Sequence, residues 1–436
     1  MRFRWSTVAW LAAVLLAAVN LRPAIASVPP IVDALRASLG LSASAAGVLT
    51  SVPVVCMGLF APAAAWAAAR WGTGRTMALA LGLLTVATAI RPLAGVGVLY
   101  GATVLAGVAI AVGGALMPAL VRSRFPDRVG PVTGLYTAAL IAGALIGAGG
   151  TEPLRALFGS WEAALAVWAV PAALGLLVWL VVRPTAAHRP VSAAASGGSW
   201  SPWRDRGAWM VTLYMGSQSL LYYAPLAWLA ARYTELGWSA ARAGGLLALF
   251  SATQLFSALV APALARRDPR PAILAGLLLA VGCLGLIAVA PLAAPEVWSA
   301  LLGIGVGANF ALALTVVGQI APTPGDTPKA SGMAFFVGYL LAAVGPVAVG
   351  FLHDLTGGFR VPYLALVGFG VVTLWFGFEA GSAGRSVPDR PAGSAGRPVP
   401  DRPAGSAGRS VPDRGADRDT GESRAEAGGD AHGRVG

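Results

Sequence analysis

The chain has 436 residues, of which 56% are hydrophobic and only 11% are charged, and its formal net charge is +12. An average soluble domain carries about 25% charged residues, so this composition excludes a soluble globular enzyme. The basic excess lies in short loops between apolar runs, a distribution that orients membrane helices and argues against binding of nucleic acid.

Apolar runs of about 20 residues, the length that a transmembrane helix requires, recur along the whole chain. They lie near residues 7–28, 45–69, 76–93, 97–120, 131–150, 162–182, 208–230, 243–265, 271–290, 297–318, 330–352 and 361–379. The sequence therefore predicts an all-α membrane protein with twelve transmembrane helices.

The first run also fits a cleavable secretory signal, because a basic start precedes an apolar stretch and Ala24-Ile25-Ala26. The distribution of arginine favours a retained helix. Arg and Lys concentrate in alternate loops that include the N-terminus, which predicts a multi-pass protein of the inner membrane with both termini in the cytoplasm. Removal of the first run would leave eleven spans, an odd number that conflicts with this orientation.

Arg22 lies near the outer part of the first span. An arginine at membrane depth costs about 2.5–3.5 kcal/mol and usually faces a cavity, although a long side chain near a helix end also reaches the headgroups. Pro23 removes an amide and disfavours helical geometry at Arg22, which predicts a helix break there. The break would let Asn20 and Arg22 point into one space.

A basic turn, residues 70–75, joins the second and third spans and contains Arg70, Gly72 and Arg75. Positive charge at a cytoplasmic loop is sufficient to explain it. A second interpretation is a latch that holds one conformation through ion pairs. Arg266 and Arg267, at the matching place in the second half of the chain, favour the latch.

Polar side chains inside the later spans are candidates for lining a cavity. Gln218 and Tyr222 are four residues apart and share a helix face. Each such residue alone is more often a hydrogen-bonding partner between helices than a ligand contact. The predicted substrate-binding set, with the first span included, is Asn20, Arg22, Tyr136, Gln218, Tyr222 and Asn309.

The first and second halves of the helical region share sequence features at a constant offset. At an offset of 197 Leu39, Gly40 and Arg70 match Leu236, Gly237 and Arg267, and at 198 Gly134, Gly147 and Gly159 match Gly332, Gly345 and Gly357. We expect two homologous six-helix bundles, at 1–182 and 208–379, joined by a cytoplasmic linker at 183–207. Residues 380–436, with three 12-residue repeats such as GSAGRSVPDRPA, predict a disordered low-complexity tail.

The sequence offers no constellation for catalysis, a cofactor or a metal. Its two cysteines lie in separate apolar runs, and its three histidines are not grouped with carboxylates at ligand spacing. The carboxylates before the tail fall in loops or near helix ends. The sequence therefore predicts no enzyme and no metal site, and it identifies no proton carrier.

Five segments resemble the cyanate/nitroimidazole transporter branch of the major facilitator superfamily. They are NLRPAIASVPP at 20–30, LGLSASAAGVLTSVPV at 39–54, FPDRVGPVTGLY at 125–136, GSQSLLYYAPLAWL at 216–229 and SGMAFFVGYLLAAVGPVAVGFLHDLTGG at 331–358. The resemblance implies a two-bundle fold with alternating access and transport of small solutes such as cyanate or nitroaromatic compounds. Gly113-Gly114 departs from the Gly-Asn that similar proteins often carry and removes a polar cavity group.

The sequence thus predicts a monomeric secondary transporter, embedded in the bilayer, that binds a small solute between its halves. The resemblance implies a small anion or a nitroaromatic compound as the solute, and Arg22 is the candidate charge partner. Two alternatives remain open from the residues alone. One is a carrier that exports apolar drugs, and the other is a membrane receptor or scaffold that acts through its tail.

Overall fold

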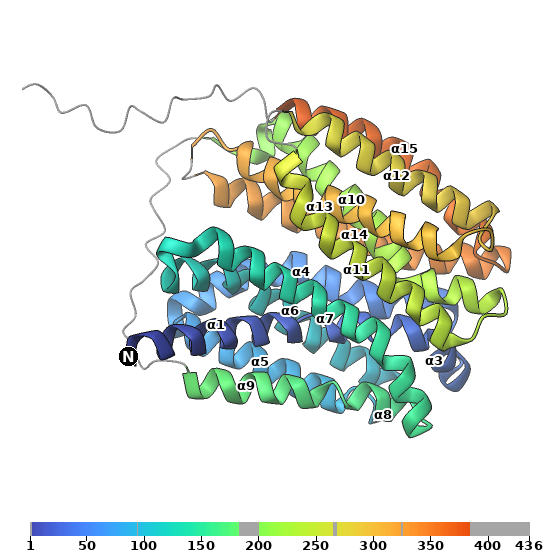
Figure 1. The fold of residues 1–436 in the computed structure, drawn as a ribbon, viewed down its shortest axis with the longest axis horizontal. Helices are drawn as coiled ribbons and strands as arrows, with labels where there is room; N and C mark the ends of the chain where they lie inside the picture. The colour runs from blue at the N-terminus through green and yellow to red at the C-terminus, as the bar shows by residue number, and fades with distance from the viewer. Residues whose placement is uncertain (1, 94, 183–199, 265–267, 324–325, 384–436) are drawn as a thin grey trace, which may run out of the picture. The chain divides into compact units, whose positions relative to one another are not determined.

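A computed structural model describes residues 2–93, 95–182, 200–264, 268–323 and 326–383 (Figure 1). All regular secondary structure within these ranges is helical. Arg266, Arg267, most of the predicted linker and nearly all of the predicted tail lie outside the described residues.

The first half contains α1 (Arg2–Asn20), α2 (Pro23–Ala26), a 3-10 turn (Pro29–Ile31), α3 (Val32–Leu39), α4 (Ala43–Trp71), α5 (Thr73–Ile90), α6 (Gly95–Arg124), a second 3-10 turn (Pro126–Arg128), α7 (Val129–Phe158), α8 (Trp161–Ala166) and α9 (Ala169–Val182). The second half contains a 3-10 turn (Pro202–Arg204), α10 (Arg206–Glu235), α11 (Ala240–Leu264), α12 (Pro269–Val289), α13 (Pro295–Gln319), α14 (Thr327–Thr356) and α15 (Arg360–Ala383). Each of the twelve predicted spans coincides with one of these helices or, for α1–α2 and α8–α9, with a broken helix.

Hydropathy and length alone identify eleven candidate membrane spans among the described residues, and the predicted span they omit is α10. This helix has 30 residues, of which 22 are buried, and it packs against α11, α13, α14 and α15. A helix that is enclosed by other helices has little contact with lipid, so polar and aromatic side chains are tolerated there. Burial in protein therefore explains why α10 can cross the membrane although its mean hydropathy is low.

The internal repetition reappears in the way the helices end. Gly159 after α7 and Gly357 after α14 both adopt a φ of 70° and accept the left-handed conformation that terminates a helix. Their amides donate to the carbonyls of Arg155 and His353, one turn earlier in each helix. Equivalent helices in the two halves thus stop by the same local mechanism.

The two halves meet along α4 with α14 and along α7 with α11. Small residues allow the closest approach of α4 and α14. A Cβ atom at Gly47 would lie 2.5 Å from the Pro346 carbonyl oxygen, and one at Gly350 would lie 2.5 Å from the Ala43 carbonyl oxygen. These contacts lie toward the membrane end that contains α3, called the α3 end below. The opposite end, which contains the α4–α5 turn and the C-terminus of α9, is called the linker end.

Candidate functional site

The candidate site begins where the first span is interrupted. Helix α1 ends at Asn20 and α2 begins at Pro23, which occupies the first helical position, where its missing amide removes no hydrogen bond. Arg91 at the end of α5 donates from Nη1 to the Ala24 carbonyl at 2.7 Å and is itself buried. This bond holds the short α2 in place and fixes the direction in which Arg22 leaves the chain.

Arg22 extends from the first half toward three tyrosines of the second half. Its Nη1 donates to the Tyr223 hydroxyl of α10 at 3.1 Å. Tyr222 of α10 and Tyr339 of α14 lie close enough to interact electrostatically with the guanidinium. The result is a cation in the middle of the protein whose neighbours are phenol rings and hydroxyls.

The three tyrosines are held by other aromatic rings. Tyr222 stacks on Phe250 of α11 with ring centroids 5.8 Å apart, and Tyr339 stacks on Phe335 at 5.7 Å. Tyr222 and Tyr223 meet edge to face at 4.8 Å. Such contacts fix the ring orientations without using the hydroxyls. Besides its bond with Arg22, Tyr223 donates from its hydroxyl to Met57 Sδ at 3.9 Å, and the Tyr222 hydroxyl interacts with Gln254.

No carboxylate forms an ion pair with Arg22 within the described part of the chain. Arg22 is only partly buried, so part of its surface remains accessible. A guanidinium presents five donors in a planar fork that matches oxyanions, and a charged group at this depth requires a partner. The geometry is therefore suited to a polar or anionic solute.

Two asparagines that we predicted in this site face elsewhere. Asn20 donates from Nδ2 to the Leu16 carbonyl at 2.8 Å and lies against Gly175 of α9. Asn309 accepts from the Tyr214 hydroxyl at 2.7 Å and lies against Gly276 of α12. Each is almost completely buried inside its own half. The structure does not bring either of them to Arg22.

Of the three remaining predicted residues, one belongs to the tyrosine cluster and two have other partners. Tyr222 is part of the cluster around Arg22. Gln218, one turn earlier on α10, is buried and donates from Nε2 to Ser219 Oγ at 2.8 Å, while its Oε1 has no hydrogen-bond partner. Tyr136 on α7 is half-buried and interacts with Thr137 and Arg122, toward the linker end.

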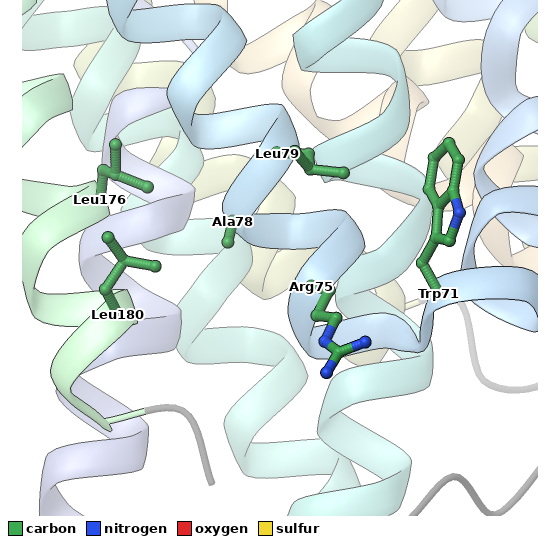
Figure 2. A pocket seen from close by; sticks show the side chains of 6 residues that line it. All are labelled: Trp71, Arg75, Ala78, Leu79, Leu176 and Leu180. Atoms are coloured by element: carbon green, nitrogen blue, oxygen red, sulfur yellow. The ribbon is translucent and has the colours of Figure 1, made fainter. Parts of the chain in front are cut away.

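The predicted latch residues lie at the linker end. Gly72, with a φ of 83°, makes the abrupt turn from α4 to α5, and Arg70 is exposed. Arg75 lines a groove together with Leu176 and Leu180 of α9, all within the first half (Figure 2). Between described residues, none of the hydrogen bonds or ion pairs of this turn reaches the second half.

Sequence reasoning missed Tyr223, Tyr339 and a polar connection at the α3 end. Asp354 near the end of α14 accepts hydrogen bonds from the Ala43 and Ser44 amides at the start of α4, both at 2.8 Å. Thr234 of α10 donates from its hydroxyl to Asp33 of α3. In the sequence, the only signal for this connection is a carboxylate near a helix end. The bonded residues lie more than 200 positions apart, so no local pattern pairs them.

Known proteins agree with this architecture. The sequence profile of the Major Facilitator Superfamily matches residues 9–301 and 233–412. An uncharacterized transporter, YycB of Bacillus subtilis, is 35% identical over 80% of this chain and 88% of its own length. The 2-nitroimidazole transporter of Escherichia coli is 34% identical over 85% and 95%, and the cyanate transport protein CynX of Escherichia coli is 33% identical over 82% and 94%.

Solved structures show the same fold at low sequence identity. A bacterial homologue of the human lysosomal transporter Spinster, in an inward-facing and occupied conformation, superposes with a TM-score of 0.71 at 16% identity, over 87% of this chain and 97% of that one. A variant of the nucleoside transporter NupG gives a TM-score of 0.70 at 12% identity, over 85% and 99%. The chain belongs to the major facilitator superfamily, in its cyanate/nitroimidazole transporter branch, and is a secondary transporter of a small solute.

Proposed function

We propose that this transporter carries a small anion, of the size and charge of cyanate, and that Arg22 is its charge partner. The observation that carries the proposal is the arginine at the junction of the two halves, bonded to Tyr223 at 3.1 Å and without a carboxylate partner among the described residues. The name of one relative, a cyanate transport protein, supports the same chemistry.

A nitroaromatic solute is the second candidate. A nitro group also accepts hydrogen bonds from a guanidinium, and an aromatic ring would stack beside the Tyr222–Phe250 and Tyr339–Phe335 pairs. The 2-nitroimidazole transporter among the relatives supports this candidate. The two solutes differ in net charge, so only the anion requires Arg22 for charge neutralisation.

The proposed cycle alternates access to Arg22 between the two membrane ends. Contacts of Asp354 and Asp33 across the halves close the α3 end in the conformation described. We propose that these bonds break when the α3 end opens. Because Arg22 in the first half and Tyr223 in the second belong to different moving bodies, the solute would bridge them in the closed intermediate.

The proposal also covers the orientation of the chain in the membrane, the boundaries of its parts and its oligomeric state. Arginine is more abundant in loops at the linker end, which supports cytoplasmic termini and a periplasmic α3 end. We propose a monomer without nucleic-acid partners, with bundles at 1–182 and 208–379, a linker at 183–207 and a tail at 380–436. Both bundles contribute to one central site, so a single chain is sufficient for transport.

Uptake of labelled cyanate into proteoliposomes tests the solute and the role of Arg22. We expect saturable flux in the native protein and a loss of about ten- to a hundredfold in Arg22→Ala, the effect of removing charged hydrogen bonds worth about 1.5–3 kcal/mol. Arg22→Lys keeps the charge and loses the planar fork, so its flux should be intermediate. Repeating the assay with an imposed pH gradient reveals coupling to protons.

Arg128→Ala serves as the matched control, because it removes an exposed arginine at the linker end. Size-exclusion profiles of all variants check folding. Cyanate flux in a well-folded Arg22→Ala protein that equals native flux would overturn the proposal. Flux of nitroimidazoles alone, insensitive to Arg22→Lys, would instead favour the second candidate.

A further inference from the structure

A lateral groove at the linker end is separate from the site around Arg22. It has a volume of about 490 Å³ and is lined by Trp71, Arg75, Ala78, Leu79, Leu176 and Leu180. Figure 2 shows Arg75, Ala78 and Leu79 on α5, with the two leucines of α9 on one side and Trp71 on the other. Leu79 and Leu180 are 58% and 40% exposed. In a membrane protein, such an apolar surface faces lipid.

The walls of the groove are fixed by a hydrogen bond between its two helices. Trp179 of α9 donates from Nε1 to the Gly74 carbonyl in the first turn of α5, at 2.9 Å, and Trp179 is fully buried. The bond holds the C-terminal part of α9 beside the start of α5. The groove is therefore a property of the folded first half and does not depend on the second half.

Aromatic residues indicate the depth of the groove in the membrane. Trp66 and Trp71 at the end of α4 form an edge-to-face pair at 5.5 Å and are 61% and 39% exposed. Exposed tryptophans concentrate at the level of lipid headgroups. Leu79 lies four residues beyond Arg75 on α5, which corresponds to about 6 Å of helix. Arg75 thus lies near headgroup depth and Leu79 at acyl-chain depth.

The charge at the headgroup end of the groove is positive and unpaired. Arg75 is exposed and forms no ion pair within the described residues, and exposed Arg70 lies across the same turn. The first turn of an 18-residue helix, α5, adds the positive end of its dipole. Basic pockets of this kind, next to an apolar channel, match a phosphate that carries an acyl chain.

We propose that this groove binds an anionic phospholipid, with the phosphate at Arg75 and one acyl chain along Ala78, Leu79, Leu176 and Leu180. In this proposal Arg75 anchors the lipid headgroup. On the orientation proposed above, the lipid belongs to the cytoplasmic leaflet. The lipid site itself depends neither on that orientation nor on the transported solute.

Lipid retention measured on the full-length chain tests the proposal. The protein is assembled in nanodiscs of phosphatidylcholine with a tenth of phosphatidylglycerol, released into detergent and analysed by native mass spectrometry. We expect retention of phosphatidylglycerol over phosphatidylcholine. Arg75→Ala should lower that preference about fivefold, the effect of the ~1 kcal/mol that one basic residue contributes near an anionic lipid.

Two further variants separate this site from general electrostatic attraction. Arg128→Ala removes an exposed charge at the same membrane end, outside the groove, and should retain the native preference. Leu180→Trp fills the apolar channel and leaves every charge in place, and it should lower retention as well. Soluble glycerol phosphate should not displace the lipid, because it lacks the acyl chain.

Equal losses in Arg75→Ala and Arg128→Ala would overturn the proposal, since they would indicate diffuse attraction. Native retention in Leu180→Trp would overturn it too, because the apolar channel would then be irrelevant. Displacement by glycerol phosphate would identify a simple anion site instead. None of these measurements uses transport, so a failure here is distinguishable from a failure of the proposed function.

Discussion

The two membrane ends of this transporter treat their polar groups differently. At the α3 end, Asp354 and Asp33 bond to groups of the opposite half, and glycines bring α4 and α14 into backbone contact. At the linker end, Arg75 faces a lateral groove, and Asp326 pairs with Lys329 of its own helix. Among the contacts just named, polar groups join the halves at the α3 end and lie within one half at the linker end.

This difference explains which end is closed without any reference to the solute. A carboxylate that accepts two amides at a helix N-terminus is a charge-assisted contact supported by the helix dipole. It closes the α3 end only while α4 and α14 remain close. The linker end lacks an equivalent bond between described residues, so opening there breaks fewer polar contacts.

The largest expected effect follows from replacing Gly47 with valine. Its Cβ atom alone would lie 2.5 Å from the Pro346 carbonyl oxygen, and overpacking against backbone of this kind costs about 3 kcal/mol or more, the upper end of the usual range. We expect α4 and α14 to separate at the α3 end and uptake of cyanate, the proposed solute, to fall sharply. Spin labels at Ala37 and Leu292, one in each half at the α3 end, should report a longer distance after the buried cysteines are replaced.

Gly332→Val on α14 is the matched control, because no atom lies within 4 Å of a Cβ at that position near the linker end. It should leave the distance between the α3-end labels unchanged. If Gly332→Val separated these labels as far as Gly47→Val did, close packing at Gly47 would not be the cause of closure.

A smaller effect is expected from Asp354→Asn. The amide keeps the size of the side chain and one acceptor oxygen, but it loses the charge and replaces the other oxygen, which accepts from one of the Ala43 and Ser44 amides, with an NH2 group that cannot accept. Loss of one charge-assisted hydrogen bond, worth about 1.5–3 kcal/mol, should raise the α3-end-open population about tenfold or more. The same spin-label pair should show a second, longer distance.

Labels at Ser123 and Gln319, at the linker end, provide the control for this variant. The population shift should shorten their distance as the α3 end opens. An unchanged distribution at both ends would mean that the Asp354 carboxylate caps α4 without influencing the conformational equilibrium.

Local features of this protein could be predicted from the sequence, and contacts between distant residues could not. The twelve helices were predictable because the length of an apolar run is a local property, and residues 20–23 carry the interruption of the first span in adjacent positions. The partners of Arg22 were not predictable in the same way. Tyr223 is 201 residues away, and pairing it with Arg22 requires the relative position of two helices.

Asn20 illustrates the limit for side-chain direction. Successive residues of a helix point about 100° apart, so a turn of two residues after α1 is sufficient to separate Asn20 from Arg22. Asn20 packs on Gly175 and Asn309 on Gly276, so each asparagine fills the space left by a glycine on a neighbouring helix. Substrate binding by these asparagines stays a prediction that the geometry does not favour.

The smallest effect concerns Asp326 at the linker end. Its carboxylate accepts from Lys329 Nζ at 2.9 Å and from the Thr323 hydroxyl at 2.7 Å, which lowers its pKa below the usual value. A lowered pKa means that this stabilisation is present above the ordinary aspartate pKa and is lost as pH falls through the lowered value. The contribution of Asp326 to thermal stability should therefore be fully present, and independent of pH, between pH 6 and 8.

Asp326→Asn should lower the melting temperature at pH 7 by less than Asp354→Asn does, and the difference from the native protein should shrink in acid as the native carboxylate becomes protonated. Because the Asp326 contacts lie within the second half, spin-label distances at both membrane ends should stay at their native values. A changed distance at the linker end would show that the Asp326–Lys329 pair also restrains the halves, and the contrast between the two ends would then be one of strength and not of kind.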